Sequence, residues 1–220
     1  MEKVAVLASG GLDSSILLAD LAKSCLVFPI YVQKGLSWEN QERKALRSFL
    51  GALGSPNVQP TILLSVPVHA LYNKHWSLSG DDIPSANTPD NAVFLPGRNI
   101  LLLGLAAIWC STHDVSRIAI GSLKGNPFED ATSKFFNQFA NILSIGLAHP
   151  IIIDAPYRGR HKEDLVRCFQ HLPLELTLTC IAPRGGSHCG QCNKCYERHL
   201  AFTKAGVPER IPFTLAAKRR

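Results

Sequence analysis

Four cysteines near the C-terminus have the spacing of a metal site. They are Cys180, Cys189, Cys192 and Cys195, in the order C-x8-C-x2-C-x2-C. A C-x2-C unit lets two thiolates reach one ion from a tight turn, and four sulfur ligands favour a closed tetrahedral zinc site. Because such a site keeps no open position, its metal is expected to be structural. An iron–sulfur cluster is the alternative centre, and His188 is an alternative ligand.

A glycine loop near the N-terminus has the composition of a phosphate-binding site. A short apolar run leads into SGGLDSS, residues 9–15. Small residues let backbone N–H groups approach phosphate oxygens, the hydroxyls of Ser9, Ser14 and Ser15 add donors, and the following helix directs its positive end there. The lysine of the common GxxxxGK[ST] loop is absent, and Asp13 would repel a bare phosphate. We therefore expect a divalent ion beside Asp13 or a turn-capping role, and an ordinary strand-to-helix turn is the alternative.

Two cations elsewhere in the chain could act on an anionic group. Arg98, in FLPGRN at 94–99, could bind a carboxylate or phosphate through its planar guanidinium. Lys162, near the end of a predicted strand, could neutralise negative charge on an intermediate. Each also fits an ordinary surface role. The remaining cysteines are expected to be structural: Cys25, Cys110 and Cys168.

Alternating strand and helix patterns must position these groups. Strand-like segments cover 3–8, 26–32, 58–66, 117–122 and 149–157. Helical patterns cover 13–22, 38–53, 100–112, 129–146 and 161–171. This order predicts an α/β fold with a doubly wound parallel sheet, whose ligands sit at the carboxyl ends of the strands. The loops that fall at those ends are 9–15, 121–132 and 155–162.

The chain is expected to divide into a main α/β domain, 1–172, and a small zinc-binding module with a C-terminal helix or tail, 173–220. The module has few apolar residues, so a metal would supply the folding free energy that it lacks. The segment 77–92 is rich in turn-forming residues and is expected to be a mobile loop.

Composition narrows the function classes. The chain has 220 residues, a formal net charge of +6 and 46% hydrophobic residues. The most apolar segment, 100–110, is shorter than the roughly 18 residues of a membrane span, and no signal peptide is evident, so a cytoplasmic location is expected. Seven cysteines then favour metal binding over disulfides. The positive charge is scattered, so nucleic-acid binding is not expected, and the basic cluster Lys218, Arg219 and Arg220 is expected to be a frayed tail.

The glycine loop resembles the SGGxDS loop of the N-type ATP pyrophosphatases. Their loop grips the pyrophosphate of ATP, and AMP and pyrophosphate are released, which fits a loop without the lysine. FLPGRN resembles the VPGRN stretch of the 7-cyano-7-deazaguanine synthase family within that group. TLTC at 177–180 with CGQCNKC at 189–195 resembles its zinc module, and KED at 162–164 resembles its lysine and acidic residue. The resemblance covers about residues 3–206 and implies a Rossmann-like fold.

The resemblance also implies site residues and ligands. ATP with Mg²⁺ would contact Leu7, Ala8, Ser9, Gly10, Gly11, Leu12, Asp13, Ser14 and Ser15. The acceptor substrate would contact Phe94, Pro96, Gly97, Arg98, Asn99, Gly121, Lys124, Phe128 and Asp130. Catalytic roles would fall to Arg98, Asp130 and Lys162.

One stretch departs from the family pattern. Where the synthases typically read GYPDCRxxF, this chain has PFEDATSKF at 127–135. The proline, cysteine and arginine become Glu129, Ala131 and Thr132. Lys124 is the candidate to replace the lost positive charge.

The resemblance implies an ATP-dependent ligase of queuosine biosynthesis. It would convert 7-carboxy-7-deazaguanine and ammonia to 7-cyano-7-deazaguanine through adenylated intermediates, as a homodimer. A paralogue could instead stop at the amide, or couple an adenylated deazaguanine to an amine on a protein or nucleic acid. A tRNA-thiolating enzyme is less expected, and so is a purely structural zinc protein.

Overall fold

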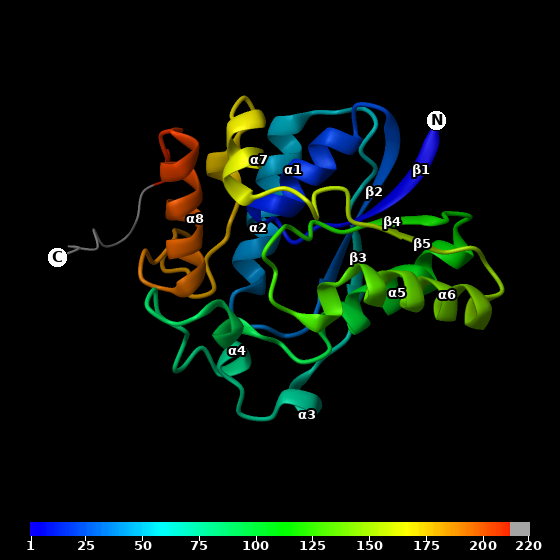
Figure 1. The fold of residues 1–220 in the computed structure, drawn as a ribbon, viewed down its shortest axis with the longest axis horizontal. Coiled ribbons are helices and arrows are strands. Elements are labelled where there is room, and N and C mark those ends of the chain that lie inside the picture. The colour runs from blue at the N-terminus through cyan, green and yellow to red at the C-terminus, as the bar shows by residue number, and fades with distance from the viewer. Residues whose placement is uncertain (212–220) are drawn as a thin grey trace.

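A five-stranded parallel sheet forms the centre of the molecule. The computed structural model describes residues 1–211, so Lys218, Arg219 and Arg220 lie outside the described residues. The strands are β1 (Glu2–Leu7), β2 (Cys25–Gln33), β3 (Ile62–Ser65), β4 (Arg117–Ala119) and β5 (Ile152–Asp154). They pair in the order β3-β2-β1-β4-β5, with every neighbouring pair parallel (Figure 1). The predicted doubly wound parallel sheet is confirmed.

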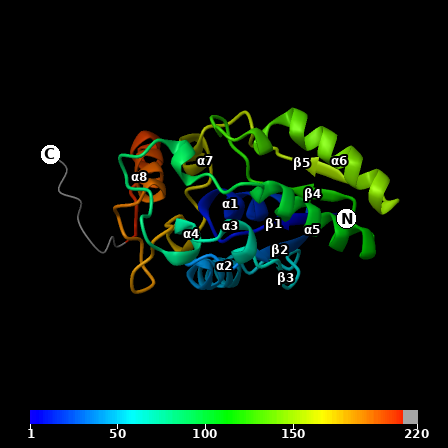
Figure 2. The same cartoon turned by 90° about the horizontal axis from the view of Figure 1, so that it is seen from below.

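Helices cover both faces of this sheet. The longer ones are α1 (Leu12–Leu21), α2 (Glu39–Leu53), α5 (Arg98–Thr112), α6 (Ser133–Leu147), α7 (Lys162–Cys168) and α8 (Asn193–Ala205). The short ones are α3 (His69–Tyr72), α4 (Trp76–Ser79) and three 3₁₀ turns, η1 (Asp90–Val93), η2 (Glu129–Ala131) and η3 (Leu174–Leu176). Helices α1, α2 and α7 cover one face and α5 and α6 the other, while α8 packs beside α7 (Figures 1 and 2).

Strand β1 shows why both faces must be covered. Its side chains alternate, so that Val4 and Val6 enter the apolar core beneath α1, while Ala5 and Leu7 enter the core beneath α5. All four are buried. A strand segment buried on both sides is a continuous apolar run, as residues 4–7 are here after the exposed Glu2 and Lys3.

Some predicted elements are longer than the observed ones. Strand β3 begins at Ile62 rather than 58, because Pro60 has no N–H to donate and Val58 makes only an isolated bridge with Val27. Helix α6 begins at Ser133 rather than 129, because Thr132 caps it by accepting the Phe135 N–H at 3.1 Å. Strands β4 and β5 keep only the residues that pair across the sheet.

The strand order fixes where a ligand can sit. The chain leaves β1 toward β2 on one side, and β4 lies on the other side of β1. Such a reversal opens a crevice at the carboxyl ends of the two strands.

No helix within residues 1–211 combines the length and the apolar composition that crossing a membrane requires.

Candidate functional site

A cavity of about 510 Å³ opens at the carboxyl ends of β1 and β4. The predicted site residues that line it are Leu7, Ala8, Ser9, Gly11, Leu12, Asp13, Ser14, Phe94, Arg98, Asn99, Gly121, Lys124, Phe128, Asp130 and Lys162. Of the residues predicted to bind ATP or the acceptor, Gly10, Ser15, Pro96 and Gly97 do not line it. The glycine loop, the start of α5, the 121–132 loop and Lys162 are far apart in sequence, yet they meet at the carboxyl ends of the strands, where the strand order predicts a ligand site.

The glycine loop is shaped by its contact with α2. Gly10 has φ +77°, and a Cβ there would lie 2.5 Å from the Glu42 carbonyl oxygen, so only glycine fits. The Ser14 hydroxyl donates to the Gly11 carbonyl at 3.2 Å and accepts the Ser9 N–H at 3.3 Å. The Ser9 and Ser14 hydroxyls thus hold the loop in one conformation. Gly11 is the N-cap residue of α1, so the N-terminus of this helix lies at the cavity.

The loop after β4 approaches the same place. A Cβ on Gly121 would lie 3.2 Å from the Ser14 backbone nitrogen and from the Asp13 carbonyl carbon. This close approach lets the 121–132 loop and the glycine loop share one cavity.

A chain of charged side chains crosses the cavity. The Lys162 Nζ lies 3.0 Å from an Asp13 carboxylate oxygen and 2.6 Å from one of Glu197, which Lys194 also contacts at 2.6 Å. Burial alone would lower the pKa of Lys162, but Asp13 and Glu197 outweigh it and raise that pKa above its usual range. Burial raises the pKa of Asp13, and Lys162 offsets only part of the rise. Burial also opposes ionisation of Glu197, yet the two lysines lower its pKa to about 2. Lys162 is therefore a charged group facing the glycine loop.

Asp130 fastens the 121–132 loop to the start of α5. Its carboxylate accepts the Asn99 backbone N–H at 3.0 Å, and its carbonyl accepts the Asn99 side-chain amide at 2.9 Å. Arg98 is the first residue of that helix and faces the cavity. Phe94 and Phe128 stand together at the cavity wall, with ring centroids 5.2 Å apart. An arginine beside two aromatic rings suits a planar heterocycle that carries an anionic group.

The departure from the synthase pattern has a structural counterpart. Thr132 caps α6, and Ala131 is buried against the core beneath α5. Arg158 reaches this turn from the 155–162 loop and donates to the Ala131 carbonyl at 2.7 Å and to the Ser133 hydroxyl at 2.6 Å. Lys124 lines the cavity.

The sequence did not identify two further charged residues of the site, one directly after β2 and one on α2. Lys34 and Glu42 line the cavity, and Glu42 accepts from the Tyr31 hydroxyl at 2.9 Å and the Trp38 indole at 3.1 Å. Burial lowers the pKa of Lys34, helped by Arg98, and burial raises the pKa of Glu42. The available signal was a lysine that follows a long apolar run, residues 25–32, after a single glutamine, Gln33.

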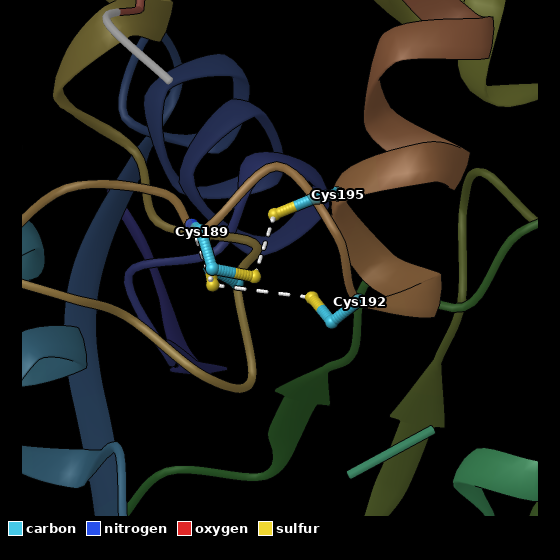
Figure 3. Close-up of side chains that lie close together, drawn as sticks. Cys189, Cys192 and Cys195 are labelled. Atoms are coloured by element: carbon cyan, nitrogen blue, oxygen red, sulfur yellow. Dashed lines mark hydrogen bonds between the residues drawn. The ribbon is translucent and has the colours of Figure 1, made fainter. Parts of the chain in front are cut away.

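The four predicted cysteines come together. Their sulfurs lie within 4.8 Å of one another, with Cys180–Cys192 and Cys189–Cys195 each at 3.9 Å. Figure 3 shows the thiols of Cys189, Cys192 and Cys195 directed toward a common centre. A tetrahedron with Zn–S bonds of about 2.3 Å has edges of about 3.8 Å, so four buried thiolates in this arrangement fit one metal ion.

His188 has another partner. Its Nε2 accepts the Thr179 backbone N–H at 3.1 Å. Burial, with Arg198 nearby, lowers the pKa of His188 to about 3, so the ring is neutral. Among residues 1–211 the metal-ligand cluster contains cysteines alone.

The cysteine module, taken as residues 173–205, docks directly on the glycine loop. The Leu178 N–H donates to the Gly10 carbonyl at 2.8 Å. Segment 77–92 also contacts the module, because Ala86 donates to the Gln191 carbonyl at 2.8 Å and Asn193 donates to the Pro84 carbonyl at 2.9 Å. The segment expected to be mobile is thus held by backbone hydrogen bonds.

The family model described as "Queuosine biosynthesis protein QueC" matches residues 3–206. The chain belongs to the QueC family. Among curated relatives it is 32% identical to 7-cyano-7-deazaguanine synthase 1 of Desulfitobacterium hafniense (strain Y51), over 91% of each chain. It is 26% identical to the 7-cyano-7-deazaguanine synthase of Methanocaldococcus jannaschii, over 97% of this chain and 99% of the relative. The relatives are named as enzymes, and the predicted family is confirmed.

A solved structure shares the fold. It is described as a predicted subunit of tRNA methyltransferase from Methanocaldococcus jannaschii, and it matches 99% of this chain and 94% of its own with a TM-score of 0.50. At 14% identity, this likeness concerns the fold alone.

Proposed function

We propose that this QueC-family chain converts 7-carboxy-7-deazaguanine and ammonia to 7-cyano-7-deazaguanine at the expense of ATP. The observation that carries the proposal is the single cavity that joins the glycine loop, Arg98 and Lys162. Full-length relatives that bear the synthase name support the same reaction. The enzyme is then an ATP-dependent C–N ligase.

The glycine loop, residues 9–15, would hold the pyrophosphate of ATP with Mg²⁺ near Asp13. The Oδ1 atom of Asp13 is buried without a hydrogen-bond partner, which suits a metal or its water. Lys162 would neutralise the phosphate charge that develops as pyrophosphate departs. No side chain need act as a nucleophile, because the substrate carboxylate attacks the α-phosphorus.

The acceptor would lie between Arg98 and the rings of Phe94 and Phe128. Its carboxylate is first adenylated, and ammonia then displaces AMP to give the amide. A second adenylation, on the amide oxygen, allows loss of AMP and leaves the nitrile. Orientation and charge neutralisation supply the rate enhancement, and Asp130 contributes by positioning Asn99.

Zinc is the metal proposed for the four cysteines, because the donor set is all sulfur and the cluster is buried. Its role would be structural. The protein is further proposed to act as a homodimer in the cytoplasm, on the family resemblance.

The second candidate function rests on the altered 121–132 loop. Thr132 and Ala131 stand where the synthases typically carry arginine and cysteine, so the acceptor's surroundings differ. A paralogue of this kind would stop at the amide, or would join the adenylated deazaguanine to an amine on a protein or nucleic acid.

One reaction separates these functions. Zinc-loaded protein is incubated with Mg-ATP, 7-carboxy-7-deazaguanine and ammonium, and the products are identified by mass spectrometry. Nitrile with AMP supports the synthase, whereas AMP with only amide or adenylate supports the paralogue. No AMP with this acceptor would contradict both assignments of substrate.

A further inference from the structure

Lys162 connects two parts of the molecule that are distant in sequence. Its Nζ lies 3.0 Å from the carboxylate of Asp13, in the glycine loop, and 2.6 Å from that of Glu197, on α8. The Lys162 side chain is 12% exposed, and those of Asp13 and Glu197 are 25% and 31% exposed. A cation held between two partly buried carboxylates has few other positions available.

Glu197 is itself fixed by the cysteine module. Helix α8 begins directly after Cys192 and carries Cys195 in its first turn. The next residue after Glu197 is Arg198, whose fully buried guanidinium donates to the Thr177 hydroxyl at 2.8 Å and to the Leu174 carbonyl at 2.9 Å. Cys192 and Cys195 precede Glu197 and the buried Arg198 follows it, so the start of α8 is fixed with Glu197 against Lys162.

We infer that Glu197 is a positioning residue for Lys162, through which the cysteine module supports the chemistry at the glycine loop. The inference rests on the proposed function, in which Lys162 faces the departing pyrophosphate. Without Glu197 the ammonium would pair with Asp13 alone and be drawn over the loop. Glu197 acts only through Lys162 and need not touch a ligand.

The charged groups around Lys162 support this role. Asp13 on α1 and Glu197 on α8 contact it, while Lys194 on α8 and the adjacent Glu163 on α7 line the same cavity. Lys194 pairs with Glu197 at 2.6 Å, three residues away on one helix face. Lys194 thus helps to fix the Glu197 carboxylate, and that carboxylate in turn holds the Lys162 ammonium.

The test compares Glu197→Gln, Glu197→Asp and Glu175→Gln for AMP release from Mg-ATP with the deazaguanine acid and ammonium. Glu175 is exposed on η3 and makes the matched control. We expect Glu197→Gln to lower kcat by roughly tenfold or more with little change in the KM for ATP, since a misplaced group costs rate more than binding. Glu197→Asp should regain part of the rate, and Glu175→Gln should equal the wild type.

A double-mutant cycle tests whether the effect passes through Lys162. If it does, Glu197→Gln adds nothing to Lys162→Met. A further loss of kcat in the double variant would overturn the inference, as would wild-type kcat in Glu197→Gln. Metal content is measured for every variant. If Glu197→Gln loses its metal, the double-mutant cycle with Lys162→Met is repeated with Glu197→Asp.

A second readout does not depend on turnover. Lys162 is labelled with an acylating reagent and quantified by peptide mass spectrometry. We expect several-fold faster labelling of Lys162 in Glu197→Gln than in wild type or Glu175→Gln, because the carboxylate favours the unreactive ammonium. Equal labelling would overturn the inference even if the wild type released no AMP, an outcome that by itself contradicts only the proposed function.

Discussion

The backbone N–H of Leu178 donates to the carbonyl of Gly10 at 2.8 Å, so the cysteine module touches the glycine loop itself. The contact places the segment that carries the four cysteines against the residues proposed to bind pyrophosphate. The module therefore supports the site in two ways, through this backbone bond and through the Glu197–Lys162 pair. Its metal would influence ATP chemistry without approaching ATP.

Gly10→Ala should destabilise the protein and weaken ATP binding. Gly10 has φ +77°, and the new Cβ would lie 2.5 Å from a backbone oxygen of α2. We expect a loss of about 1–3 kcal/mol in the free energy of unfolding, measured by urea denaturation. The matched control is Gly51→Ala in α2, where the new Cβ would meet no neighbouring part of the structure within 4 Å and a gain of about 0.5–1 kcal/mol is expected. Equal effects at the two glycines would contradict the account.

Thr132→Ala should cost about 1 kcal/mol of stability, because the Thr132 hydroxyl caps α6. Thr132→Ser keeps the cap and should be nearly neutral. Thr132→Arg, which restores the residue type typical of the synthases, should show the same loss as alanine. Unfolding curves of the three variants check this, and a stable alanine variant would remove the structural explanation for threonine at this position.

Arg198→Met should be among the most damaging single substitutions outside the cavity. The side chain is fully buried and pairs with Glu209 at 2.9 Å, and methionine would remove this buried cation from a largely buried carboxylate. A loss of about 3–5 kcal/mol is expected. The control is Arg167→Met, whose pair with Asp164 is exposed and contributes under about 1 kcal/mol. Similar melting temperatures for both variants would be inconsistent with the structure.

Thiol reagents should separate the cysteines. Cys168 is exposed and should react first in the native, metal-loaded protein, whereas burial raises the pKa of Cys110 to about 12 and makes it inert. The four module cysteines should react only after a chelator removes the metal, with a fall in melting temperature. Peptide mass spectrometry assigns each label. Fast labelling of Cys189 or Cys195 before chelation would mean that the cluster holds no metal.

The same measurement bears on the thiolation hypothesis. That chemistry needs a reactive cysteine at the site, and Cys25 and Cys110 are buried, while Cys168 does not line the cavity. Cys168→Ser is accordingly expected to keep full activity in AMP release. A large loss in that variant would revive the hypothesis.

Local patterns explain which parts of the molecule could be predicted. The apolar run of β1, the glycines after it and the cysteine spacing each depend on residues close in sequence. The short α3 and α4 were missed because four-residue helices carry almost no periodicity. The start of α6 was misplaced because the sequence did not reveal that Thr132 would act as its cap.

The polar partners could not be predicted, since tertiary packing creates them. Nothing near Glu197 in the sequence identifies Lys162 as its partner, and Lys34 gains its importance only when α2 and Arg98 enclose it. Asp130 was expected to act on the substrate, and the structure shows its carboxylate also bonded to Asn99. Its catalytic role stays a prediction.

The most direct test of the proposed chemistry follows oxygen from the acceptor. The substrate 7-carboxy-7-deazaguanine is labelled with oxygen-18 in its carboxylate and incubated with the zinc-loaded protein, Mg-ATP and ammonium. Adenylation transfers a substrate oxygen to the phosphate at each step, so we predict that AMP carries one oxygen-18 atom and that unlabelled nitrile accumulates. Unlabelled AMP, which would come from attack of water on ATP, would contradict it.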